Sequence, residues 1–240
     1  MTERSLSVIA PSVRPLRVSG DLAIVSLKGA VDAPAIAAEM THATVLFADM
    51  RGYTALAERL RPMRVMSLLD EFFSVLARVT VAFGGEVFHM AGDSMMAGFG
   101  VRDPTRSGAC AALPAGCAML QSFAPLATRW RNELAVITGI GIGVHSGEVA
   151  MGSLGPPGRR IITLIGDTAN VAARLCDRAR AGELLYSGAV AAALSTMDEG
   201  SSAGATPFLQ LSQFELRGRR ELLDIWCVPA LEIPAGVNEQ

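Results

Sequence analysis

The chain contains few cysteines and no large excess of charge of either sign, and both absences restrict its function. Four cysteines are spread over 240 residues without any Cys-x-x-Cys pair. This distribution predicts buried thiols in a reducing compartment rather than a disulfide framework. The formal net charge is −2, so no basic field favours nucleic-acid binding. We therefore expect no nucleic-acid partner.

We also expect no segment that directs the chain to a membrane. Residues 1–5 are not followed by an apolar signal core. The longest uncharged stretch, residues 107–128, contains Pro114 and Pro125. It predicts a helical region interrupted by proline rather than a membrane span. These features predict a cytoplasmic protein without a membrane partner.

Half of the residues are hydrophobic, and their spacing predicts both strands and helices. Strands are predicted at 22–27, 43–48, 86–90, 94–99, 135–146, 159–165 and within 208–228. Helices are predicted at 33–40, 53–60, 64–83, from 107 to about 132, and from 167 onward. This order predicts an α+β sandwich with one main sheet.

Two aspartates at the ends of apolar runs are the most informative residues. Asp49 follows the strand predicted at 43–48, and Asp93 lies in the hairpin turn before 94–99. Their separation, 93 − 49 = 44 residues, leaves room for two helices and a strand. A turn beside the first strand's end would bring both carboxylates together, where they could share divalent cations. The alternatives are a helix N-cap at Asp49 and an ordinary turn residue at Asp93.

Two further segments carry groups suited to a phosphate ester. Gly52, Tyr53 and Thr54 open a predicted helix, whose free N–H groups and dipole favour anions. A plain strand-to-helix turn is the alternative. Asn170 and Arg174 lie four residues apart on one face of a predicted helix, where an exposed polar pair is the alternative.

Five motifs in a fixed order extend these observations. They are Phe-Ala-Asp-Met-Arg-Gly-Tyr-Thr at 47–54, Gly-Asp at 92–93, Gly-Ile-Gly-Val-His-Ser-Gly at 141–147, Ile-Gly-Asp-Thr-Ala-Asn-Val-Ala-Ala-Arg at 165–174 and Phe-Glu-Leu-Arg-Gly at 214–218. Together they resemble the class III nucleotidyl cyclases, the catalytic domains of adenylyl and guanylyl cyclases. The sequence lacks the Gly-Gly-Asp-Glu-Phe segment of palm-type diguanylate cyclases.

The resemblance implies a fold and a division of the chain. The fold would be a ferredoxin-like or palm-type α/β sandwich with a mostly antiparallel sheet. Residues 43–230 would form the catalytic domain, residues 1–42 a partly disordered extension without a recognisable sensor domain, and residues 231–240 a flexible tail.

The resemblance also implies a reaction and its metal ions. An adenylate cyclase converts ATP into 3′,5′-cyclic AMP and pyrophosphate by attack of the ribose 3′-hydroxyl on the α-phosphorus. Asp49 and Asp93, with the carbonyl of Met50, would bind two Mg²⁺ or Mn²⁺ ions per active site. Residues 52–54 would hold the nucleotide phosphates.

Further roles carry over to single residues. Asn170 would orient the ribose, and Arg174 would stabilise the charge that grows on the α-phosphate. Arg217 stands where a phosphate-binding lysine is usual. Because the family places its aspartates on one subunit and Asn170 and Arg174 on the other, the resemblance implies a homodimer.

Base selection is where the sequence departs from the family. Thr163, seven residues before Asn170, resembles many bacterial adenylyl cyclases. His89, four residues before Asp93, replaces the usual lysine, and histidine can donate or accept a hydrogen bond. Three alternatives stay open: a cyclase for a pyrimidine nucleotide or GTP, an inactive dimerisation or nucleotide-sensing module, and a His89 without a ligand role.

Overall fold

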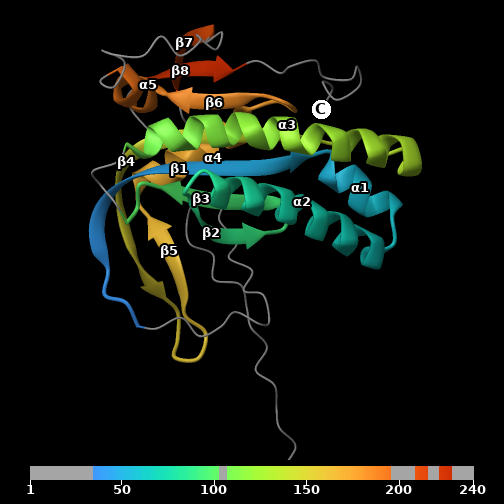
Figure 1. Ribbon diagram of the computed structural model, residues 1–240, viewed down its shortest axis with the longest axis horizontal. Coiled ribbons are helices and arrows are strands. Elements are labelled where there is room, and N and C mark those ends of the chain that lie inside the picture. Colours follow the sequence, from blue (N-terminus) through green and yellow to red (C-terminus); the bar gives the residue numbers. More distant parts are fainter. Residues whose placement is uncertain (1–34, 103–106, 196–208, 216–221, 229–240) are drawn as a thin grey trace, which may run out of the picture.

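The computed structural model describes residues 35–102, 107–195, 209–215 and 222–228. Within these ranges the chain forms one eight-stranded sheet and five helices (Figure 1). The strands are β1 (Glu39–Arg51), β2 (Glu86–Ala91), β3 (Ser94–Phe99), β4 (Gly139–Leu154), β5 (Ile161–Ile165), β6 (Leu184–Ser187), β7 (Leu209–Glu215) and β8 (Leu222–Val228). The helices are α1 (Tyr53–Arg59), α2 (Pro62–Ala82), α3 (Gly108–Leu134), α4 (Asp167–Arg178) and α5 (Gly188–Ser195).

The sheet is mostly antiparallel, as predicted. Its strands follow the order β2-β3-β1-β4-β6-β8-β7, and β5 pairs with the second half of β4. Among these pairs only β4 and β6 run parallel. The β4–β5 hairpin extends away from the body of the domain (Figure 1). The predicted α+β class is therefore confirmed.

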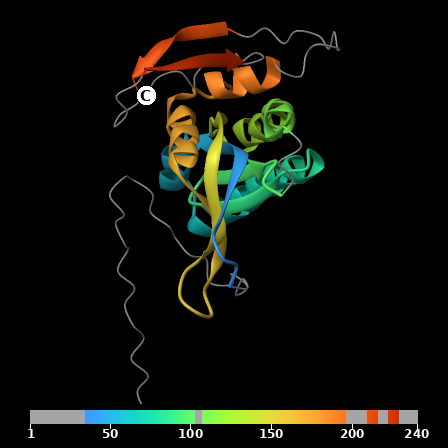
Figure 2. The same ribbon diagram turned by 90° about the vertical axis from the view of Figure 1, so that its left-hand side faces the viewer.

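Helices cover both faces of the sheet (Figure 2). Helices α2 and α3 enclose the larger core, where the Phe123 ring meets the rings of Phe72 and Trp130 edge-on, each with centroids 5.6 Å apart. Helix α4 encloses a second core with Val45 and Phe47. Since side chains alternate along a strand, Asp49 shares the α4 face of β1 with Val45 and Phe47.

Helix α3 differs from its prediction, because it continues through both Pro114 and Pro125. A proline inside a helix costs about 3 kcal/mol, and burial of large side chains such as Met119, Phe123 and Trp130 offsets that cost. By length and composition α3 could cross a membrane. Here it packs against β1, β3 and β4 as a core helix.

The beginning and end of the domain also depart from expectation. The prediction of a helix at 33–40 was wrong for the residues that the structure describes. Residues 35–38 form neither helix nor strand, and β1 begins at Glu39. Strand β6 and helix α5 were not predicted. The strand expected at 22–27 and the tail at 231–240 lie outside the described residues.

Candidate functional site

Asp49 and Asp93 lie next to each other because β1 pairs with β3. Asp49 stands opposite Ser94, and the Met50 N–H donates to the Asp93 carbonyl at 3.1 Å. The β2–β3 turn therefore brings Asp93 beside the end of β1, as the sequence predicted. The N-cap of α1 is Gly52, without a side-chain hydrogen bond, so the N-cap alternative for Asp49 was wrong.

The surroundings of both carboxylates disfavour their charged forms. Burial, followed by the negative charge of Asp93, raises the pKa of Asp49 to about 6, against the lowering effect of Arg51. Burial also raises the pKa of Asp93. Asp177, in the last turn of α4, adds a further negative charge near Asp49. The site therefore concentrates acidic groups that a cation would stabilise.

The carboxylates of Asp49 and Asp93 suit Mg²⁺ or Mn²⁺, which need few side-chain ligands, better than a metal that is bound by side chains alone. No group of three or more His, Cys, Asp and Glu residues in the described part of the chain could hold a metal ion. Mg²⁺ is commonly held by one or two carboxylates together with substrate phosphates, which matches Asp49 and Asp93. The Met50 side chain is buried in the core, so this residue could contribute only its backbone.

Gly52 makes the sharp turn from β1 into α1. Its φ of +81° lies in the left-handed region, and an added Cβ would collide with the carbonyl of Ile137. Tyr53 is half-buried against the core, whereas Thr54 is exposed. The turn therefore exposes backbone next to Asp49, as the predicted phosphate-binding role requires.

His89 is turned toward the α4 face by an irregularity in β2. The pairing shifts between Val87, opposite Ala97, and His89, opposite Met96. This bulge places Phe88 and His89 on one face while Val87 stays in the larger core. The Nε2 atom of His89 is buried without a hydrogen-bond partner in the structure.

A buried ring nitrogen needs a hydrogen-bond partner, and no side chain or backbone group of the described residues supplies one here. Burial also lowers the pKa of His89, so its imidazole is neutral near pH 7. Thr163, the second residue predicted to select the base, lies half-buried in β5 opposite Gly152. Strands β2 and β5 contact each other, which places the two residues on neighbouring strands.

Asn170 and Arg174 lie on the face of α4 that points away from the sheet. Ala172 and Cys176 pack in the second core, whereas Asn170 is exposed and Arg174 half-buried. At about 100° per residue, Arg174 is turned by about 200° from Cys176. Because Cys176 lies by the acidic site, Arg174 points away from the aspartates of its own chain.

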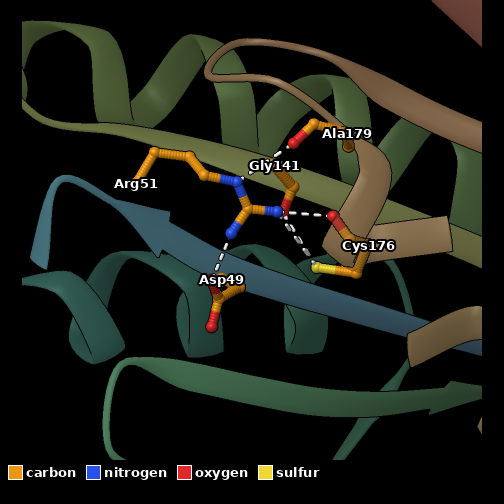
Figure 3. Close-up of polar contacts among 5 residues, drawn as sticks. All are labelled: Asp49, Arg51, Gly141, Cys176 and Ala179. Atoms are coloured by element: carbon orange, nitrogen blue, oxygen red, sulfur yellow. Dashed lines mark hydrogen bonds and ion pairs between the residues drawn. The ribbon is translucent and has the colours of Figure 1, made fainter. Parts of the chain in front are cut away.

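Arg51 belongs to the site but was given no role from the sequence (Figure 3). Its Nη1 donates to Asp49 Oδ2, its Nη2 to the Cys176 carbonyl and its Nε to the Ala179 carbonyl at 3.0 Å. Strand spacing indicated only that Arg51 and Asp49 share a face of β1, because residues two apart in a strand point the same way. By contrast, Arg217 lies outside the described residues.

The fold and its paired carboxylates define a nucleotidyl cyclase domain. A family model, the adenylate and guanylate cyclase catalytic domain, matches residues 36–228. The chain therefore belongs to this family, the class III nucleotidyl cyclases.

Curated relatives support the assignment over part of their length. An adenylate cyclase of Anabaena cylindrica is 29% identical over 162 residues, 64% of this chain and 30% of the relative. Adenylate cyclase 1 of Rhizobium meliloti is 29% identical over 200 residues, 79% of this chain and 28% of the relative. The chain thus spans less than a third of the length of these two relatives.

Solved structures confirm the fold. The adenylyl cyclase CyaB from P. aeruginosa has a TM-score of 0.73 and 24% identity, covering 83% of this chain and 98% of that one. The guanylyl cyclase Cya2 has a TM-score of 0.69 and 23% identity over the same shares. Since these neighbours include both an adenylyl and a guanylyl cyclase, the fold does not decide the base.

Proposed function

We propose that this domain is an adenylate cyclase that converts ATP into 3′,5′-cyclic AMP and pyrophosphate. A bond forms between the ribose 3′-oxygen and the α-phosphorus, the bond to the bridging oxygen breaks, and the hydroxyl proton is released. The adenylate cyclases among the relatives support this reaction. The adjacent carboxylates of Asp49 and Asp93 are the observation that carries it, because they form an acidic site suited to a metal–triphosphate complex.

The residues that would hold two Mg²⁺ or Mn²⁺ ions are Asp49 and Asp93, with the backbone carbonyl of Met50. Bound there, the ions supply Lewis-acid stabilisation of the triphosphate and of the developing 3′-alkoxide. The turn at Gly52, Tyr53 and Thr54 would receive the phosphates at its free N–H groups. This assignment is supported by the exposure of Gly52, whose backbone no side chain covers at the start of α1.

The active site would be shared between two copies of the chain. Asn170 and Arg174 point away from the aspartates of their own chain, so they would serve the aspartates of a second copy. Asn170 would orient the ribose, and the Arg174 guanidinium would stabilise charge growing on the α-phosphate. A twofold axis creates two equivalent sites from one chain, and Arg217 would add a phosphate contact in each.

The base would be recognised by His89 and Thr163. The neutral imidazole of His89 can donate to a purine ring nitrogen from one tautomer and accept from an amino group in the other. Its unpartnered Nε2 supports a ligand contact there. We favour adenine because adenylate cyclases are among the relatives. The second candidate is a cyclase for a pyrimidine nucleotide or GTP, because His89 can either donate or accept a hydrogen bond.

A subunit-mixing experiment tests the shared site. We expect the Asp49→Ala and Asn170→Ala proteins to be inactive alone with Mn²⁺ and ATP. Mixed after subunit exchange, they should regain roughly a quarter of wild-type activity, since half of the dimers are mixed and each carries one intact site. A mixture of Asp49→Ala with Asp93→Ala is the control and should stay inactive. Failure of the first mixture to recover, with exchange verified, would contradict the shared site.

A further inference from the structure

We propose that Arg51 is a positioning residue that fixes the Asp49 carboxylate against the C-terminal end of α4. The proposal rests on the metal-binding role given to Asp49 above. It adds that the orientation of this metal ligand depends on α4 of the same chain. That helix carries Asn170 and Arg174, which would serve the other active site of the dimer.

The contacts of Arg51 carry the argument (Figure 3). All three guanidinium nitrogens donate: Nη1 to Asp49, Nη2 to the carbonyl of Cys176 and Nε to the carbonyl of Ala179. The side chains of Arg51 and Asp49 are only 20% and 26% exposed. The two carbonyls belong to the last turn of α4 and its C-cap, where the helix dipole favours a cation. The guanidinium is thus anchored on the helix and directed at the carboxylate.

The strand next to β1 leaves space for this arrangement. Gly141 stands opposite Asp49 in the β1–β4 pair. An added Cβ at Gly141 would lie 2.9 Å from Cζ of Arg51 and 2.7 Å from the Ala179 carbonyl oxygen. A side chain at this position would therefore displace the guanidinium from the end of α4.

Repulsion between the carboxylates explains why Asp49 needs a fixed partner. Asp93 and Asp177 both place negative charge near Asp49, and Arg51 supplies the compensating positive charge. Without Arg51, the Asp49 carboxylate would lose this hydrogen bond and could turn away from Asp93. Because residues that orient a metal ligand affect metal affinity, the role of Arg51 should appear in Mn²⁺ binding itself.

Mn²⁺-dependent thermal stabilisation tests this without any substrate. For Arg51→Ala we expect the Mn²⁺ concentration at half-maximal stabilisation to rise about tenfold or more. Arg51→Lys should fall between wild type and Arg51→Ala, because one ammonium cannot reach three acceptors. The control is Arg102→Ala, which removes an exposed arginine that also binds a carboxylate, that of Glu86, and its midpoint should not change.

If Arg51 only stabilised the fold, the experiment would give a different result. In that case the Arg51→Ala substitution would lower the melting temperature without Mn²⁺ and would leave the Mn²⁺ midpoint unchanged. An unchanged midpoint would therefore overturn the proposal, as would a lower one, which would mean that Arg51 competes with the metal. A raised midpoint in Arg51→Ala with partial recovery in Arg51→Lys supports it.

Mixed dimers locate the effect on one subunit. Arg51→Ala is added either to the Asn170→Ala subunit, which supplies the working Asp49, or to the Asp49→Ala subunit. We expect the Mn²⁺ midpoint of cyclase activity to rise about tenfold in the first case and to change little in the second. Equal effects in both would overturn the proposal. If the mixture of Asp49→Ala and Asn170→Ala shows no activity, the shared active site is contradicted. The Mn²⁺ midpoints of thermal stabilisation in the single Arg51 variants still test the role of Arg51.

Discussion

At the residue scale, Asp49 and Asp93 form an acidic cluster whose surroundings disfavour the charged carboxylates. Asp49 is half-buried beside Asp93, and its pKa of about 6 reflects burial first and the neighbouring charge second. The buried thiol of Cys176 contributes no reactive group there, because burial raises its pKa to about 12. The titratable groups of this cluster that change charge near neutral pH are therefore the aspartates rather than the thiol.

This protonation predicts how stability depends on pH. The pKa of Asp49 is raised from 3.8 to about 6 in the folded state, so the folded protein binds this proton more tightly than the unfolded chain. In metal-free protein the resulting stabilisation is complete below about pH 4 and is lost as pH rises through about 6. Mn²⁺ requires the deprotonated carboxylate. The Mn²⁺-induced rise in melting temperature should therefore be small at about pH 5 and grow as pH rises through about 6.

Thermal unfolding with and without Mn²⁺ across this pH range checks the expectation. Asp49→Asn serves as the control, because its amide does not titrate and it should lose most of the Mn²⁺ effect at every pH. Equal Mn²⁺ stabilisation of the wild type at about pH 5 and about pH 7.5 would contradict the assigned pKa shift.

Sequence reasoning identified the aspartates but not all of their surroundings. Asp49 and Asp93 could be found because each follows an apolar run, and strand pairing then brings them together. The role of Arg51 could not be found from spacing alone, since its partners Cys176 and Ala179 lie more than 120 residues further along the chain. The orientation of His89 depends on the bulge in β2, which no local sequence pattern predicted.

At the element scale, α4, which carries Asn170 and Arg174, packs closely on β4, the neighbour of β1 in the sheet. Gly141 and Gly143 lie on the α4 side of β4, so the helix backbone packs directly on the strand. An added Cβ at Gly143 would lie 2.8 Å from the Cα of Cys176 and would also collide with the Ala172 carbonyl. Both are backbone atoms, so the strain could be relieved only by moving α4.

We therefore expect Gly143→Ala to lower the free energy of unfolding by about 1–3 kcal/mol or more, the usual range for overpacking. Urea denaturation measures this directly. Gly188→Ala, at the start of α5, is the matched control, because its Cβ would meet the Trp226 ring at 3.3 Å, a neighbour that can shift slightly. Its effect should stay within about 0.5 kcal/mol. Equal stabilities of the two variants would contradict the close packing of α4.

Most elements could be predicted because their hydrophobic patterns are local and strong. The strands at 43–48, 86–90 and 94–99 were found at or near their observed positions. The continuity of α3 through two prolines could not be predicted, since tertiary packing outweighs the local cost. Strand β6, with four residues, is too short to give a periodic signal.

At the scale of the whole molecule, the chain carries two groups of predicted site residues that face in different directions. The aspartates lie at the end of β1, whereas Asn170 and Arg174 lie on the outward face of α4. A twofold dimer would join each group to its complement.

The most direct test of the proposed function is to identify the product. Purified protein is incubated with Mn²⁺ and ATP, GTP, CTP or UTP in separate reactions, and the products are identified by mass spectrometry. We predict cyclic AMP as the dominant product, with none from Asp49→Ala. A dominant cyclic GMP or cyclic pyrimidine nucleotide would contradict the choice of base. No cyclic product from any nucleotide, in a dimeric protein that binds Mn²⁺, would contradict the enzymatic function itself.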